Sequence, residues 1–282
     1  MSDLRVPEAQ LRHYITRSMA ALGLPQDDAA CVGQLMAEAD LQGSDGHGVI
    51  RLPPYSRRIL AGGVNVRPNI KVIEERAAMA LIDGDNGMGH LVMKQAADLA
   101  VEKARRCGIA WVGSRFSNHA GPASLYARMA LPHDMIGLYF AVGNANHLPP
   151  WGGLDMLLST NPIAVAIPAL KEAPIVLDMA TTVAAYGKVK AKAQRGEMMP
   201  EGWMIDRVGK PLLDPLPLAT LCCSNSASTA SCVKCVAASA CLAWTASGCL
   251  ASKARPSACS MASKASRLRQ RSCSNSMRLP CN

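Results

Sequence analysis

The composition of the chain changes abruptly near position 215, and this break limits which part can fold. Residues 1–214 contain 22 Lys and Arg and all 21 Asp and Glu. Residues 215–282 contain eight Lys and Arg, no acid and nine of the 11 cysteines. The hydrophobic periodicity that marks helices and strands also stops there. The sequence therefore predicts a folded body over residues 1–214, long enough to bury a core, and a disordered Cys/Ser/Ala-rich tail over 215–282.

The tail itself admits several interpretations. Cys232 and Cys235 form a Cys-x-x-Cys pair, but no second pair follows at the spacing of a zinc site. A disulfide scaffold would require an oxidising compartment, and disordered basic tails are seldom this rich in cysteine. We interpret the segment as an out-of-frame translation of GC-rich DNA, which gives runs of Ala, Ser, Cys, Arg and Pro.

The net charge of +9 is mainly a property of the tail, so it says little about the partners of the body. The body alone carries 22 basic against 21 acidic residues, which does not indicate a nucleic-acid surface. No run of about 18 apolar residues is present, and the N-terminus lacks the apolar region of a signal peptide. We therefore expect a cytoplasmic protein that binds neither nucleic acid nor membrane.

Helical and strand patterns alternate through the body. Apolar periodicity and end signals predict helices over residues 7–22, from about 27, over 55–60, 91–106 and 122–130. Short apolar runs predict strands at 80–83, 109–113, 135–142, 164–168 and 175–178. This order predicts an α/β fold, with an N-terminal helical segment over 1–72 and an α/β region over 73–214. Parallel and antiparallel pairing both stay open.

A glycine-rich stretch follows the first predicted strand. Gly84, Gly87 and Gly89 have the spacing G-x-x-G-x-G, whereas the dinucleotide fingerprint is G-x-G-x-x-G with an acid about 20 residues further on. The sequence therefore excludes an ordinary Rossmann fingerprint.

The chemically richest stretch is Ser-Asp-Gly-His-Gly-Val-Ile-Arg-Leu-Pro-Pro-Tyr, residues 44–55. His47 can transfer a proton near neutral pH, and Arg51 offers a planar fork suited to a carboxylate. The four-residue spacing of His47, Arg51 and Tyr55 would place all three on one face if the segment were helical. The residues alone leave open a plain surface turn.

Two further candidates follow predicted strands. His119 lies in Ser-Asn-His-Ala-Gly, where α/β proteins place active groups, although a helix start capped by Asn118 explains it equally well. Asp178 ends the strand 175–178 and suits either a ribose or a helix cap. No acid or cysteine stands at matched spacing to the histidines, so no metal site is predicted. The remaining histidines are interpreted as loop, surface or cap residues: His13, His90, His133 and His147.

Together these motifs resemble the type-2 malate/L-lactate dehydrogenases, a family that includes ureidoglycolate, sulfolactate and diketogulonate dehydrogenases or reductases and a cyclic-imine reductase. The resemblance covers about residues 3 to 215, in family order and spacing. The stretches that carry it are residues 44–49 with Arg51 and Tyr55, 82–89, 117–121, 150–153, 160–162, 175–182 and 200–203.

The resemblance implies an α/β, non-Rossmann nicotinamide-binding fold and usually an interlocked homodimer. It implies an NAD- or NADP-dependent oxidoreductase that transfers a hydride between nicotinamide and a small 2-oxo or 2-hydroxy acid. Which histidine is the acid/base stays open. By position, the matching residues are His47 and His119 as catalytic residues, Arg51 and Tyr55 as substrate-binding residues, and Asn144, Asp178, Met179 and Ala180 as cofactor-binding residues.

The tail departs from the family. After a segment like Pro200–Trp203, family members continue with a glycine-rich segment that contacts cofactor and with helices that complete the core and the dimer. Residues 216–282 contain one glycine, Gly248, and no such segment is recognisable. We therefore expect impaired activity and weakened dimerisation. The alternative is a non-catalytic thiol-rich or metal-binding protein on a dehydrogenase remnant.

The out-of-frame interpretation predicts that another frame of the gene encodes a globular α/β continuation beyond codon 214. Translating the nucleotide sequence in all frames tests this. If neither other frame yields such a continuation, residues 215–282 are genuine protein sequence.

Overall fold

The computed structural model describes residues 5–44, 46–143, 147–206, 208–215 and 239–245. For the strand 239–245, and for Tyr186, Lys190 and Ala191, it describes the backbone alone. All of these residues belong to one compact unit, Met1–Ala246.

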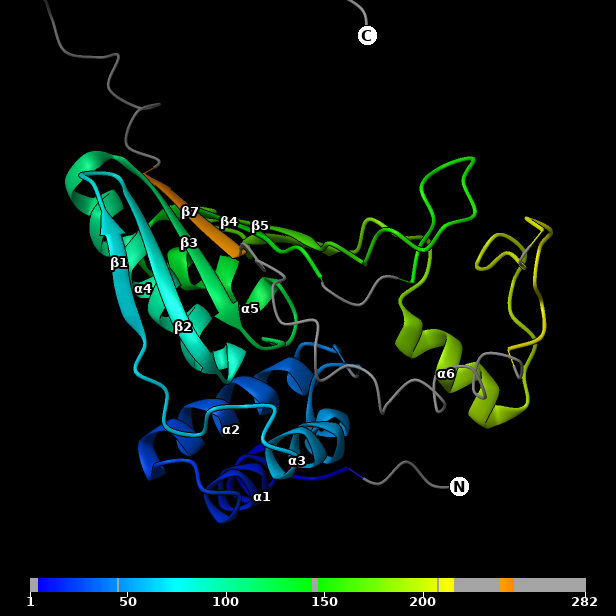
Figure 1. The fold of residues 1–282 in the computed structure, drawn as a ribbon. Helices are drawn as coiled ribbons and strands as arrows, with labels where there is room; N and C mark the ends of the chain where they lie inside the picture. The colour runs from blue at the N-terminus through cyan, green and yellow to red at the C-terminus, as the bar shows by residue number, and fades with distance from the viewer. Residues whose placement is uncertain (1–4, 45, 144–146, 207, 216–238, 246–282) are drawn as a thin grey trace, which may run out of the picture. The chain divides into compact units, whose positions relative to one another are not determined.

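Three helices and a 3-10 turn form the N-terminal segment (Figure 1): α1 (Glu8–Ala21), α2 (Gln26–Leu41), η1 (Val49–Arg51) and α3 (Leu52–Leu60). Pro7 and Pro25 stand immediately before α1 and α2, where a fixed φ suits helix entry. Ile15 and Met19 of α1 are buried in one cluster with side chains of α2 and with Tyr55 of α3. The helices predicted over 7–22 and from 27 are confirmed.

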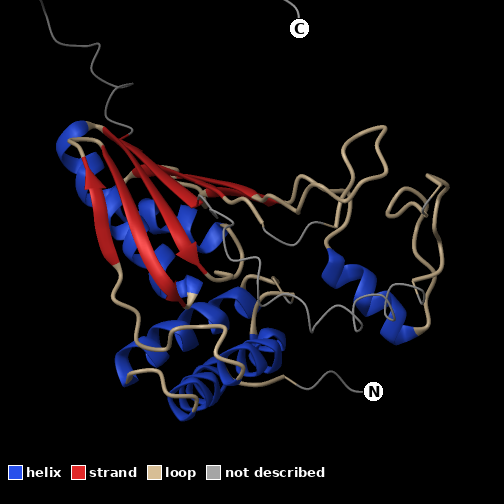
Figure 2. Ribbon diagram, viewed as in Figure 1, coloured by secondary structure: helices blue, strands red, loops and turns tan. Residues whose placement is uncertain are grey.

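After the N-terminal segment the chain forms a seven-stranded mixed sheet with further helices between its strands (Figure 2). Its strands are β1 (Lys71–Glu75), β2 (Met79–Gly87), β3 (Ile109–Ser117), β4 (Met135–Phe140), β5 (Ile163–Ile167), β6 (Ile175–Met179) and β7 (Ser239–Thr245). Their order across the sheet is β1-β2-β3-β7-β4-β5-β6. Within it β2 and β3 are parallel, and every other neighbouring pair is antiparallel.

Helices cover one face of this sheet. The long helix α4 (Gly89–Cys107) links β2 to β3, and α5 (Ser124–Ala127) with η2 (Arg128–His133) links β3 to β4. Ala110 and Val112 of β3 are buried beneath them, whereas Trp111 points to the other face and is 38% exposed. Close approach of α5 requires glycine at position 137, because a Cβ there would overlap the Ala127 carbonyl. A further helix, α6 (Tyr186–Arg195), follows β6.

Three elements were not predicted from the sequence. Strand β1 is exposed throughout, including its apolar residues Val72 and Ile73, and it crosses the boundary expected between residues 72 and 73. Helix α6 is short and rich in Lys and Arg, and Val189 is buried in it. Strand β7 lies within the segment expected to be disordered, and the structure differs from that expectation there. Its sequence, Ser-Ala-Cys-Leu-Ala-Trp-Thr, carries no charge, Gly or Pro and therefore fits a central strand. The rest of the tail after 215 lies outside the described residues.

The position of β7 makes a testable prediction, since β3 and β4 pair with β7 and not with each other. Leu242 lies in register with Trp111 of β3 and Leu138 of β4. Leu242→Pro removes a backbone donor from a central strand and is expected to lower the unfolding free energy by about 2 kcal/mol or more. Urea denaturation measures this.

The matched control is Leu170→Pro, at a loop residue that is 96% exposed. We expect this change to have a much smaller effect. Equal destabilisation by the two substitutions would show that β7 contributes no more than a surface loop.

Candidate active site

The loop that carries His47 is held by the end of α2. The Val49 amide donates to Oδ2 of Asp40 over 2.8 Å, and the His47 amide donates to the Ser44 carbonyl over 2.8 Å. Gly48 lies so close to Asp40 that a Cβ would overlap the carboxylate. Glycine at 48 is therefore required for the loop to sit on α2.

Arg51 and Tyr55 continue from this loop into η1 and α3. Nε of Arg51 donates to the Gly46 carbonyl over 2.6 Å, which leaves the terminal guanidinium nitrogens for another partner. Tyr55 lies one turn further on and is 8% exposed. His47 precedes the first helical turn, so the prediction that all three share one helix face holds for Arg51 and Tyr55 only.

His119 lies in the loop that follows β3. The Asn118 side-chain amide donates to the carbonyls of Asn86 and Gly87 over 2.8 and 3.0 Å. On the other side of this contact Gly89 packs against the Asn118 carbonyl without room for a Cβ. Asn118 therefore ties the loop to the β2–α4 turn and is not a helix cap.

Four rings from different elements meet at this loop, and we call them the ring cluster: His47, His119, Tyr55 and His90. The Tyr55 hydroxyl lies 2.6 Å from Nδ1 of His119. The His47 and His119 rings stack with centroids 5.5 Å apart and planes 11° from parallel. Tyr55 meets His90 edge to face with centroids 5.8 Å apart. The structure thus brings His119 together with His47 and Tyr55, which lie 64 or more residues earlier in the sequence.

The hydrogen bonds to His119 assign its tautomer. The Gly121 backbone amide donates to Nδ1 over 3.3 Å. Because a backbone amide has no acceptor, Nδ1 must accept, and the Tyr55 hydroxyl must donate to the same atom. The neutral ring then carries its proton on Nε2, which is its hydrogen-bond donor.

The environment keeps all three imidazoles neutral at pH 7. Desolvation by the surrounding side chains lowers the pKa of His119 well below its usual value. Electrostatic repulsion from Arg51, His47 and His90 lowers it further. Part of His119 is nevertheless exposed to solvent. Neighbouring side chains can desolvate one side of a ring while its other side stays exposed. Burial and Arg51 also lower the pKa of His47, whereas Asp178 raises it.

His90 was predicted to be a surface or cap residue, and that prediction is wrong. It lies in the first turn of α4 and is 0% exposed. Neither ring nitrogen has a hydrogen-bond partner among the described residues. The apolar run Leu91–Met93 follows His90 directly, and all three of its residues are buried as well. This run is the sequence signal for burial at the start of α4.

Asp178, near the end of β6, contacts the start of α5 and influences the ring cluster. Its Oδ2 accepts a hydrogen bond of 2.8 Å from the amide of Ser124, the first residue of α5, so it caps a helix that precedes it in the chain. The same carboxylate acts electrostatically on His47. Met179 beside it is 45% exposed, so this strand end is open to a ligand. Asn144 lies outside the described residues.

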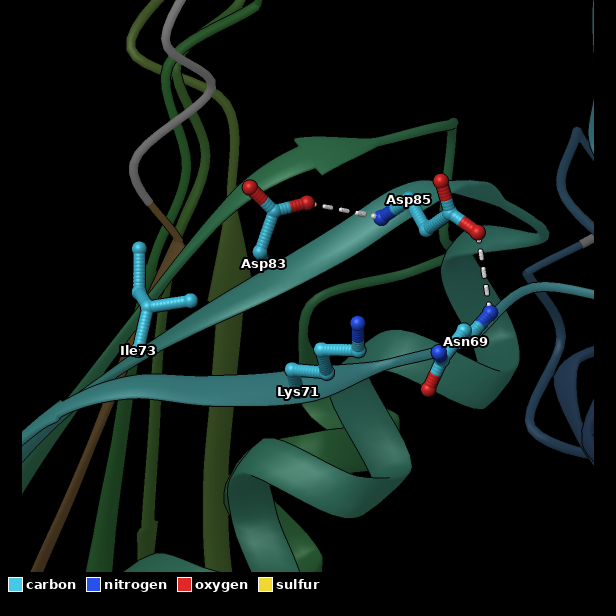
Figure 3. A pocket seen from close by; sticks show the side chains of 5 residues that line it. All are labelled: Asn69, Lys71, Ile73, Asp83 and Asp85. Carbon is cyan, nitrogen blue, oxygen red and sulfur yellow. Dashed lines mark hydrogen bonds between the residues drawn. The ribbon is translucent and has the colours of Figure 1, made fainter.

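Other features of the described residues lie apart from the ring cluster. A pocket of about 270 Å³ beside β1 and β2 is lined by Asn69, Lys71, Ile73, Asp83 and Asp85 (Figure 3). Its carboxylates already accept hydrogen bonds from Arg115 and from the amides of Asp85 and Asn69. No group of three metal-ligating side chains gathers anywhere in the described ranges. Nor does any helix there combine the length and apolar character needed to cross a membrane.

Comparison with known proteins identifies the family of the chain. A family model described as malate/L-lactate dehydrogenase matches residues 6–234. The chain belongs to this family. The family match thus extends beyond residue 215, where the motif resemblance ends.

Individual family members are similar over most of the body. The malate dehydrogenase of Pyrococcus abyssi is 44% identical over 208 residues, which cover 73% of this chain and 57% of that protein. The ureidoglycolate dehydrogenase (NAD(+)) of Escherichia coli K12 is 30% identical and is covered to 62%. The chain therefore spans about three fifths of these curated relatives.

A solved structure of a family member has the same fold. The sulfolactate dehydrogenase of Methanocaldococcus jannaschii superposes with a TM-score of 0.73 at 29% identity. The match covers 86% of this chain and 78% of that one. The expected α/β fold of the family, with its N-terminal helices, is confirmed.

A pair of glycine substitutions tests the anchoring of the His47 loop. Gly48→Ala places a methyl group into the Asp40 carboxylate, so the loop must shift, and we expect a loss of about 1–3 kcal/mol in unfolding free energy. Gly46→Ala is the control, since nothing lies within 4 Å of its Cβ position. Urea denaturation of both variants checks this. Similar losses in the two would contradict the anchoring.

Acidic pH is expected to destabilise the fold through His90. Burial lowers its pKa from 6.5 to about 4, so between these values the unfolded chain binds a proton that the folded chain excludes. Stability is therefore lost as the pH falls through this window, by about 3 kcal/mol in total.

Unfolding free energies of His90→Leu measured from pH 7 to pH 4 should fall less steeply than those of the wild type. Met93→Leu, a buried change in the same helix without a titrating group, should keep the wild-type slope. Equal slopes in all three proteins would refute the assignment to His90.

Proposed function

We propose that this chain carries the catalytic residues of an NAD- or NADP-dependent oxidoreductase that interconverts small 2-oxo and 2-hydroxy acids. The observation that carries the proposal is the Tyr55–His119 hydrogen bond, which orients a proton-donating imidazole in the electrostatic range of Arg51. The names of the relatives, malate and ureidoglycolate dehydrogenase, support a substrate with a carboxylate.

His119 is proposed as the proton donor. The nicotinamide, when bound, supplies the hydride that forms the new C–H bond at the carbonyl carbon. The carbonyl oxygen receives the electron pair of the broken π bond and takes the proton from Nε2 of His119. At the same time the Tyr55 hydroxyl passes its own proton to Nδ1, so the ring stays neutral, and Tyr55 then regains a proton from water. In the reverse direction each of these proton transfers runs backwards.

Arg51 is proposed to hold the substrate carboxylate. Its Nε is occupied by the Gly46 carbonyl, so the guanidinium is fixed while its terminal nitrogens can form a bidentate pair. Such a pair also changes the proton affinity of the site. Arg51 lowers the pKa of both His47 and His119, so a bound carboxylate that neutralises it would raise both values.

The cofactor is proposed to bind at the end of β6. Asp178 uses Oδ2 for the Ser124 amide, which leaves its other oxygen for a ribose hydroxyl, and the residue is exposed. Its electrostatic effect on His47 supports a cofactor site close to the ring cluster. Met179 and Ala180 would continue the contact, and Asn144 is proposed as a further cofactor contact.

We further propose that this exact chain turns over slowly. The family's glycine-rich cofactor segment has no recognisable counterpart in residues 216–282, which contain one glycine and no acid. The purified chain is expected to oxidise little NADH or NADPH with any 2-oxo acid. A chimera in which residues after 214 are replaced by the corresponding segment of the Pyrococcus abyssi malate dehydrogenase is expected to be active. Robust turnover by the unaltered chain would refute this part of the proposal.

Substrate binding is testable without turnover. Oxamate, an unreactive 2-oxo acid analogue, is expected to bind the chain, and Arg51→Lys should weaken it about 10- to 100-fold because a bidentate, charge-assisted pair is lost. Arg57→Lys on the exposed side of α3 is the control. Isothermal titration calorimetry measures the affinities. Equal affinity of the wild type and Arg51→Lys would overturn the role of Arg51.

A further inference from the structure

The proposed reaction assigns no step to His90, a member of the ring cluster. It is fully buried in the first turn of α4, and both of its ring nitrogens lack partners among the described residues. An apolar side chain of similar size would avoid that desolvation cost. A buried polar ring without partners, next to the candidate site, calls for an explanation beyond core packing.

His90 contacts both groups that donate to Nδ1 of His119. The Tyr55 ring, whose hydroxyl is the first donor, meets His90 edge to face at 80°. Gly121, whose amide is the second donor, lies close to the imidazole ring of His90. A Cβ at Gly121 would be 3.1 Å from Nε2 and 3.7 Å from Cδ2 of His90.

Glycine is required at position 121 on two grounds. Its φ is +81°, a conformation that favours glycine, and a Cβ there would approach Nε2 of His90 to 3.1 Å, closer than most side-chain contacts. His90 therefore lies against both Tyr55 and the Gly121 position.

We propose that His90 is a positioning residue that fixes the tautomer of His119 by supporting both donors to its Nδ1, Tyr55 and Gly121. Its importance for catalysis rests on the proposed function, whereas its effect on the tautomer does not. The first turn of α4 favours a neutral side chain, because the positive end of the helix dipole opposes an imidazolium there. His90 thus supports the site as an uncharged ring.

The test is the ring-nitrogen NMR spectrum of the full chain labelled with 15N-histidine, at a pH above the pKa of free imidazole. The His119 signals are assigned from their loss in His119→Gln. In the wild type we expect one tautomer, protonated on Nε2. In His90→Ala we expect signals of both tautomers or their average, because Tyr55 and Gly121 lose their common support.

Added imidazole should enter the cavity of His90→Ala and restore the single tautomer, as buried cavities bind small molecules of matching shape. Met93→Ala is the matched control. It creates a cavity in the same helix beside Ser114, away from Tyr55, and should leave the tautomer unchanged. His90→Gln fills a similar volume without a ring and serves if His90→Ala does not fold; it should show the same loss.

A single Nε2-protonated tautomer in His90→Ala or His90→Gln would overturn the proposal, as would an equal disturbance in Met93→Ala. Because the spectrum does not depend on turnover, the proposal is decided even if the chain reduces no 2-oxo acid. Conversely, oxamate binding and turnover decide the proposed function whatever the tautomer of His119.

Discussion

The hydrogen bond between Tyr55 and His119 is the contact on which the candidate site depends. It joins α3 of the N-terminal helices to the loop after β3, across 64 residues of sequence. Each partner is held independently: Tyr55 by burial in the helical core, and His119 by the Asn118 contacts to the β2–α4 turn. A short bond between two separately fixed groups can orient an imidazole far more precisely than either segment could alone.

The electrostatics of the site follow from the same packing. Three imidazoles and one arginine gather in a crowded region, so protonation of any one ring is opposed by desolvation and by its charged neighbours. The carboxylate of Asp178 acts in the opposite direction and raises the pKa of His47. A group that neutralises Arg51 would raise the pKa values of His47 and His119, and a substrate carboxylate is suited to do so. The chemistry therefore couples binding of an acid to the proton affinity of the rings.

The sequence predicted the parts of the fold that have strong local signals. Helices α1, α2 and α4 show apolar periodicity, and β3, β4 and β6 are short apolar runs between turn signals. The motif around His47 and the loop at His119 were also found, because glycine, histidine and arginine at those spacings are chemically distinctive.

What the sequence could not predict depends on tertiary contacts. Strand β1 is short and exposed on both faces, because it is an edge strand whose one neighbour in the sheet is β2. His90 looks like a cap residue because its burial comes from Tyr55 and the Gly121 loop rather than from its own helix. Asp178 caps α5 from 54 positions further along the chain. A residue at a strand end is expected to cap the helix that follows it, whereas Asp178 caps a helix that precedes it.

The central place of β7 has a consequence for how the chain acquires its fold. Strands β3 and β4 emerge early from the ribosome, yet their common partner is synthesised about a hundred residues later. Until then each half of the sheet presents an unpaired strand edge, and such edges promote association between chains. The long sequence separation also raises the contact order, which slows folding. The nascent protein should accordingly depend on chaperones, or fold chiefly after release.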